Sequence, residues 1–82
     1  MIKILYFGKL REALQCHEET LEWSGNDTEA LLKFLRSRDQ NWAEALSEKN
    51  IFRIVVNQQI IENHTQIPEG AEVAILPPVT GG

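Results

Sequence analysis

Residues 2–7 read IKILYF, a run of β-branched and aromatic side chains that predicts a β-strand. Side chains alternate along a strand, so one face carries Ile2, Ile4 and Tyr6 and the other carries Lys3, Leu5 and Phe7. Apolar residues on both faces indicate a strand near the middle of a sheet. Gly8 ends the run, and leucine and alanine then recur at spacings of three and four, which predicts a short helix over residues 9–15.

Further strands and a longer helix are predicted after this region. The strands fall at residues 19–23, 51–57, 60–61 and 73–76, where apolar and β-branched residues alternate or cluster. The main helix follows the turn at residues 24–27, since Asn26 and Glu29 have the spacing of a cap residue and its N3 acid. Its apolar stripe runs to about residue 36, and a second short helical pattern covers residues 42–46. This order predicts an α+β domain with a helix packed on one face of a sheet.

The composition limits the classes of function that fit the chain. Its 82 residues carry a net charge of −4, with 8 Lys plus Arg against 12 Asp plus Glu, and fit one small domain. Since no basic cluster is present, we expect no nucleic-acid partner. The apolar runs are too short to span a bilayer and no signal peptide is apparent, so we expect no membrane association. Cys16 is the only cysteine, which excludes an intramolecular disulfide and fits the cytoplasm.

The C-terminal segment PPVTGG, residues 77–82, differs in character from the domain that precedes it, residues 1–76. Its two prolines fix φ and remove two backbone donors, so we expect the chain to leave the domain extended. The two final glycines carry no Cβ and fit narrow channels, which leaves the terminal carboxylate of Gly82 unhindered. These residues alone fit two interpretations equally: a frayed terminus, or a carboxylate that enters another protein's active site.

Four motifs together resemble the MoaD family, the small sulfur-carrier subunits of molybdopterin synthase. They are MIKILYF at residues 1–7, Arg11-Glu12, Val56-Asn57-Gln58, and LPPVTGG at residues 76–82. The resemblance covers essentially the whole chain in length and element order, and the PPVTGG ending is its most specific part. It implies a ubiquitin-like β-grasp fold, with a mixed sheet of about five strands, a main helix on one face and an extended C-terminal tail.

The resemblance implies a carrier that is not an enzyme on its own. An E1-like partner uses ATP to adenylate the carboxylate of Gly82, and sulfur from a donor enzyme then replaces AMP to leave a thiocarboxylate. The large synthase subunit, where the catalytic residues are expected, receives the tail residues Pro77, Pro78, Val79, Thr80 and Gly81. There the sulfur converts cyclic pyranopterin monophosphate into the dithiolene of molybdopterin, within a heterotetramer. No bound cofactor is implied, because the glycyl adenylate and the thioglycine are covalent intermediates.

The resemblance also implies an exposed hydrophobic patch beside the tail, formed by Phe7, Ile60 and Leu76, which binds both the activating enzyme and the large subunit. Phe7 falls on the strand face opposite to the predicted core face, which fits exposure. Taken from the residues alone, the better interpretation is that all three side chains belong to the core. Arg11 is expected to add a charged contact at the rim of the patch, with a solvated position on the helix as the alternative.

The cysteine and the histidines predict no further site. Glu18 and Glu19 follow Cys16 closely, and acidic neighbours raise the pKa of a thiol, so Cys16 is interpreted as a partly buried residue without a role in sulfur transfer. His17 and His64 lie far apart in the sequence with no second cysteine, so no metal site is expected.

Several other functions fit a β-grasp domain that ends in Gly-Gly, because one fold serves many roles. A sulfur carrier for thiazole synthesis or for tRNA thiolation differs only in its biosynthetic partners, and the PPVT spacer favours the molybdopterin branch. A ubiquitin-like modifier forms isopeptide bonds through Gly82, whereas a plain interaction module tolerates loss of both terminal glycines.

Overall fold

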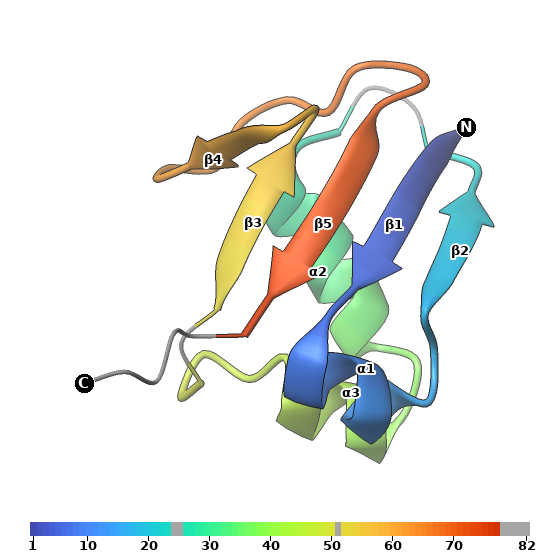
Figure 1. The fold of residues 1–82 in the computed structure, drawn as a ribbon, viewed down its shortest axis with the longest axis vertical. Helices are drawn as coiled ribbons and strands as arrows, with labels where there is room; N and C mark the ends of the chain where they lie inside the picture. Colours follow the sequence, from blue (N-terminus) through green and yellow to red (C-terminus); the bar gives the residue numbers. More distant parts are fainter. Residues whose placement is uncertain (24–25, 51, 78–82) are drawn as a thin grey trace.

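A computed structural model describes residues 1–23, 26–50 and 52–77 of the chain (Figure 1). In chain order, its elements are β1 (Ile2–Tyr6), α1 (Gly8–Leu14), β2 (Glu18–Leu21), α2 (Thr28–Arg36), α3 (Gln40–Ala45), β3 (Arg53–Val56), β4 (Gln59–Ile61) and β5 (Glu72–Leu76). Each predicted strand and helix has a counterpart among these elements. The prediction of an α+β domain is therefore confirmed. No helix in the described residues is long and apolar enough to cross a bilayer.

The strands form one mixed sheet in the order β2-β1-β5-β3-β4. β1 and β5 pair in parallel, while the other neighbours pair antiparallel. Helix α2 crosses one face of the sheet, and α1 and α3 lie together at the end of the sheet where β1 and β5 finish (Figure 1). This arrangement puts the start of the tail beside α1 and α3, since the tail follows β5.

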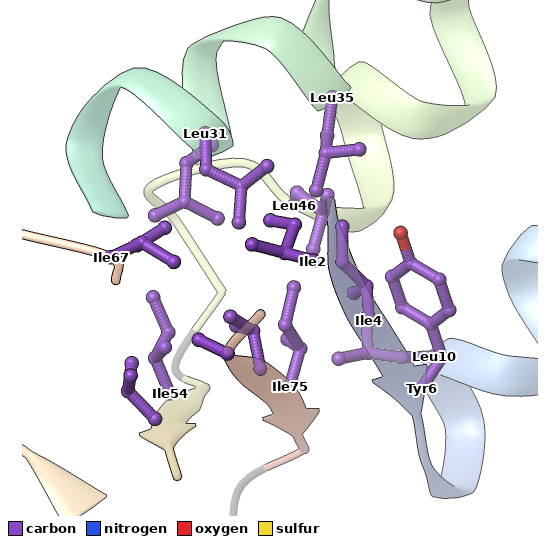
Figure 2. Close-up of a cluster of buried hydrophobic side chains, with 14 of the residues drawn as sticks. Ile2, Ile4, Tyr6, Leu10, Leu31, Leu35, Leu46, Ile54, Ile67 and Ile75 are labelled. Atoms are coloured by element: carbon purple, nitrogen blue, oxygen red, sulfur yellow. The ribbon is translucent and has the colours of Figure 1, made fainter. Parts of the chain in front are cut away.

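The core lies between α2 and the sheet, where alternate side chains of the central strands meet the apolar stripe of the helix (Figure 2). Its buried members include Ile2, Ile4, Tyr6, Leu31, Leu35, Leu46, Val73 and Ile75. Burying an aliphatic or aromatic side chain of this size contributes about 1.5–3 kcal/mol, so each of these residues stabilises the fold substantially. Because the strands bury one set of side chains, the alternate set points to the opposite face.

The start of α2 differs from the prediction by one residue. Asp27, and not Asn26, caps the helix: its carboxylate accepts a hydrogen bond of 2.9 Å from the backbone N–H of Ala30. The backbone carbonyl oxygen of Asn26 instead accepts a hydrogen bond of 3.2 Å from the backbone N–H of Ile67. This long-range pairing was not visible in the local cap pattern.

Three strands are also shorter at their ends than predicted, and one of them is β2, which ends at Leu21 and not at residue 23. Phe7 lies outside β1 and precedes α1 as its N-terminal flanking residue, although its backbone stays extended at φ −127° and ψ 158°. The predicted strand over residues 51–57 is confirmed only for Arg53–Val56. Ile51 lies outside the described residues.

A tight hairpin turn joins β3 to β4 at Asn57 and Gln58, which have φ values of 49° and 70°. The turn also binds β5: the N–H of Asn57 donates to the carbonyl of Glu72 at 2.8 Å, and the Asn57 side-chain oxygen accepts from the N–H of Glu72 at 3.0 Å. Asparagine tolerates the left-handed region better than most residues. This double contact gives the Val56-Asn57-Gln58 motif a structural role.

A polar network ties β1, β2 and the segment after α2 together. Arg38 donates two hydrogen bonds to the Glu19 carboxylate, at 2.8 and 2.7 Å, and the Tyr6 hydroxyl donates a third at 2.7 Å. Burial alone would raise the pKa of Glu19, but the hydrogen bonds from Arg38 and Tyr6 together outweigh it and hold that pKa below its ordinary value. Burial and the contact with Glu19 raise the pKa of Tyr6 well above its usual range. The Arg38 guanidinium also lies 4.5 Å from the ring centroid of Trp42.

Candidate partner-binding surface

The sheet face opposite α2 carries an apolar stripe across four strands. The register aligns Leu5 of β1 with Ala74 of β5, Ala74 with Val55 of β3, and Val55 with Ile60 of β4. These residues alternate with core residues along their strands, so their side chains point away from the core. Ile60 is 58% exposed, and the other three are half-buried. We call these four residues the open-face stripe.

Phe7 and Leu76 extend this surface toward the tail. Phe7 has extended backbone and its N–H donates to the carbonyl of Ile75 at 3.3 Å, so it continues the alternation of β1 beside the end of β5. Leu76 is the last residue of β5 and is half-buried. Phe7 is 41% exposed, so the interpretation of Phe7 and Ile60 as core residues is wrong. An exposed apolar surface of this kind is typical of a protein-binding site.

The sequence predicts Phe7, Ile60 and Leu76 for this surface but not the residues that connect them. Leu5, Val55 and Ala74 are small or aliphatic residues in predicted strands, and the strand pattern alone does not say which strands are neighbours. Only the sheet order shows that β5 lies between β1 and β3 and joins the separate apolar positions into one surface.

The base of the tail packs against the junction of β1 and α1. Pro77, the last described residue, is half-buried, and its ring contacts Gly8 so closely that a Cβ on Gly8 would lie 2.7 Å from the Pro77 Cγ. Gly8 also has φ +57°, a conformation that favours glycine. The tail therefore leaves the domain directly beside Phe7. Residues 78–82, including the predicted site Gly82, lie outside the described residues.

Three exposed cations lie on α1 and β3, the two elements that flank the base of the tail. Lys9 and Arg11 are exposed on α1, and Arg53 is exposed on β3, opposite Leu76 in the sheet register. Among the described residues, none of the three is in an ion pair; the ion pairs there involve Lys3, Arg38 and the N-terminal ammonium. In a chain with a net charge of −4, these three cations provide groups that can complement an acidic surface. Arg11 is exposed on α1, and its place at the rim of a partner-binding patch stays a prediction.

Cys16 has surroundings that disfavour its thiolate. The side chain is half-buried, and its sulfur donates a long contact of 3.7 Å to the carbonyl of Glu18. Burial raises the pKa of the Cys16 thiol, and the nearby carboxylate of Glu19 raises it further. The acidic neighbour therefore raises the pKa of Cys16 as expected, although burial is the larger cause of the increase.

The fold agrees with comparisons to known proteins. A family model described as the ThiS family matches residues 4–82. The chain belongs to the ThiS family. Proteins similar to the chain include the molybdopterin synthase sulfur carrier subunits of Haemophilus influenzae and Escherichia coli, each 33% identical over 82 residues in an alignment that covers 100% of both chains. These matches confirm the resemblance that the tail and the strand motifs indicated.

Solved structures support the same fold. The small archaeal modifier protein SAMP1 from Methanosarcina acetivorans superimposes with a TM-score of 0.74 at 27% identity, covering 99% of this chain and 95% of that one. A putative molybdopterin converting factor subunit 1 from Pyrococcus furiosus gives a TM-score of 0.71 at 21% identity, covering 95% and 97%. This ThiS family member therefore has the ubiquitin-like β-grasp fold that the resemblance implied.

Proposed function

We propose that this ThiS family chain is the sulfur carrier subunit of a molybdopterin synthase and acts in molybdenum cofactor biosynthesis. The observation that carries the proposal is the placement of the tail: LPPVTGG starts at the end of β5, beside the exposed Phe7 and the open-face stripe. A partner that binds this surface therefore meets the tail at the same time. The full-length relatives named as sulfur carrier subunits support the pathway.

The chemistry takes place at the carboxylate of Gly82. An E1-like enzyme transfers AMP from ATP to this carboxylate and releases pyrophosphate, which turns a poor electrophile into a reactive acyl adenylate. A sulfur atom at the sulfide oxidation level, supplied by a donor enzyme, attacks the acyl carbon, and AMP leaves with one carboxylate oxygen. The product is a thiocarboxylate, a softer and stronger nucleophile than the carboxylate. Both steps take place at the end of the chain, so the catalytic residues are expected in the partner proteins.

The large synthase subunit then receives the tail in the cytoplasm, within a heterotetramer. The thiocarboxylate sulfur is transferred to cyclic pyranopterin monophosphate, and hydrolysis returns Gly82 to its carboxylate form. Two such deliveries build the dithiolene of molybdopterin. The carrier contributes docking and positioning, which lower the entropic barrier to reaction in the partner's site.

Deletion of Gly82 tests this proposal. The deletion should leave folding and binding to the large subunit largely unchanged, because the apolar surface lies within the folded domain. It should abolish conversion of cyclic pyranopterin monophosphate in a reconstituted reaction with the activating enzyme, a sulfur donor and the large subunit. Conversion at the wild-type rate would overturn the proposal.

A protein modifier is the second candidate, since the similar SAMP1 structure from Methanosarcina acetivorans is titled as a modifier protein. In that case Gly82 would be found in isopeptide linkage to lysines of many proteins. Mass spectrometry of tryptic digests from cells that express the tagged chain distinguishes the two functions. A carrier gives a free carboxylate or thiocarboxylate end, and a modifier gives branched peptides.

A further inference from the structure

A groove of about 280 Å³ lies beside the base of the tail, separate from the open-face stripe. Its walls come from α1, α3, the segment before β3 and the tail base, and they include Lys9, Leu10, Ala13, Ala45, Phe52 and Pro77. The volume is just below the range of about 300–1,000 Å³ that is typical of small-molecule sites. It suits a single large side chain better than a metabolite.

We propose that the large synthase subunit inserts one apolar side chain, flanked by a carboxylate, into this groove. The proposal rests on the proposed function and names a second contact for the same partner. Pro77 links the two surfaces, because it forms a wall of the groove and also directly follows Leu76 at the edge of the apolar surface. A subunit that contacts Leu76 and holds the tail beyond Pro77 therefore lies over the mouth of the groove.

The apolar walls of the groove favour an apolar side chain as the part of the partner that enters it. Leu10 is buried, Phe52 and Ala45 are half-buried against the core, and Ala13 is exposed on the last turn of α1. Apolar walls that stay open to water gain free energy when an apolar side chain covers them. Anchors of this type, inserted in a pocket near the centre of an interface, carry a large share of binding energy.

Positively charged side chains on and near the groove favour a carboxylate on the partner beside the inserted side chain. Lys9 lies on the groove wall and Arg53 lies on the sheet face beside Leu76, and neither is in an ion pair among the described residues. A carboxylate on the partner next to the inserted side chain is complementary to Lys9. Charge pairs at the edge of an interface contribute mainly to specificity and to the rate of association. The groove thus selects one partner surface among those that accept a Gly-Gly tail.

Two matched pairs of variants test the inference in calorimetric titrations of the full-length chain with its cognate large subunit. Ala13→Leu fills the groove, while Ala43→Leu on α3 makes the same change at a position outside the groove. We expect Ala13→Leu to weaken the Kd at least about tenfold and Ala43→Leu to change it by less than about twofold. Both variants keep helix-compatible residues, and thermal unfolding of each confirms that the domain is folded.

A second pair of variants tests the predicted contact between Lys9 and a partner carboxylate. This test is independent of the Ala13→Leu result. Lys9→Glu should weaken the Kd by about tenfold at low salt and less at high salt, whereas Lys33→Glu on α2 should change it little. Equal affinities for Ala13→Leu and Ala43→Leu would overturn the apolar contact, and equal affinities for the two lysine variants would overturn the acidic one. In both cases wild-type binding still supports the proposed function. Absence of wild-type binding would overturn both proposals.

Discussion

Ile60 and Ile61 are neighbours in β4 that face opposite sides of the sheet. Substitution by alanine should therefore weaken partner binding at Ile60 and lower the stability of the domain at Ile61. Ile60 is 58% exposed on the open face, while Ile61 is half-buried and packs against the core, opposite Ile54. Ile60→Ala should change the free energy of unfolding by less than about 0.5 kcal/mol, as is usual for exposed positions. Ile61→Ala should lower it by about 1–2 kcal/mol, less than for a fully buried isoleucine.

The effect of Ile60→Ala on partner binding follows from its exposed area. Complete burial of an isoleucine side chain contributes about 1.5–3 kcal/mol. More than half of the Ile60 surface is available for a partner, so a contact that covers it contributes about 1–2 kcal/mol, which corresponds to a Kd weaker by about 5- to 30-fold. Ile61→Ala should bind with a Kd within about twofold of the wild-type value under conditions where the variant is folded.

Urea unfolding followed by circular dichroism gives the stability of each variant, and isothermal titration with the large subunit gives its Kd. If Ile60→Ala destabilised the domain as much as Ile61→Ala, Ile60 would belong to the core and not to an exposed binding surface. If Ile60→Ala were folded and bound the large subunit as tightly as the wild type, Ile60 would not contact this partner.

Two other predictions concern stability. Arg38→Met should lower the free energy of unfolding by about 2 kcal/mol, between the values for exposed and buried ion pairs, because Glu19 loses two hydrogen bonds. Since the folded pKa of Glu19 lies below its ordinary 4.5, the contribution of this pair is present above that pH and is lost as the pH falls through the lowered pKa. Urea titrations at pH 7 and pH 3 should therefore give a larger Arg38→Met effect at pH 7, and an equal effect would contradict the assignment. Gln58→Gly should raise the free energy of unfolding by about 0.5–1 kcal/mol in the same assay, because φ +70° is strained for glutamine. A loss of stability would show that the contacts of the Gln58 side chain outweigh this backbone strain.

The elements of the fold are predictable from sequence because they depend on local patterns. The alternation in IKILYF and the apolar stripe of α2 each require only neighbouring residues, and both predictions are confirmed. Errors arose where distant residues compete for the same backbone groups. Asn26 does not cap α2, since its carbonyl binds the N–H of Ile67, a pairing between segments 41 residues apart.

The candidate site was predictable only in part for a similar reason. Phe7, Ile60 and Leu76 were identified from the resemblance, and the exposure of Phe7 and Ile60 decided against the core interpretation. The open-face stripe depends on the strand order, which local sequence does not encode. The contact of Gly8 with Pro77 joins opposite ends of the chain, and in the sequence Gly8 indicates only the end of a strand.

The most direct test of the central claim is the intact mass of the chain isolated from cells that make all its natural partners, with fragmentation to localise any change. A sulfur carrier should show a fraction heavier by one sulfur-for-oxygen exchange at Gly82, and this fraction should be lost when the activating enzyme is removed. A terminus that is always an unmodified carboxylate, with the activating enzyme and sulfur donor present, would contradict a sulfur carrier.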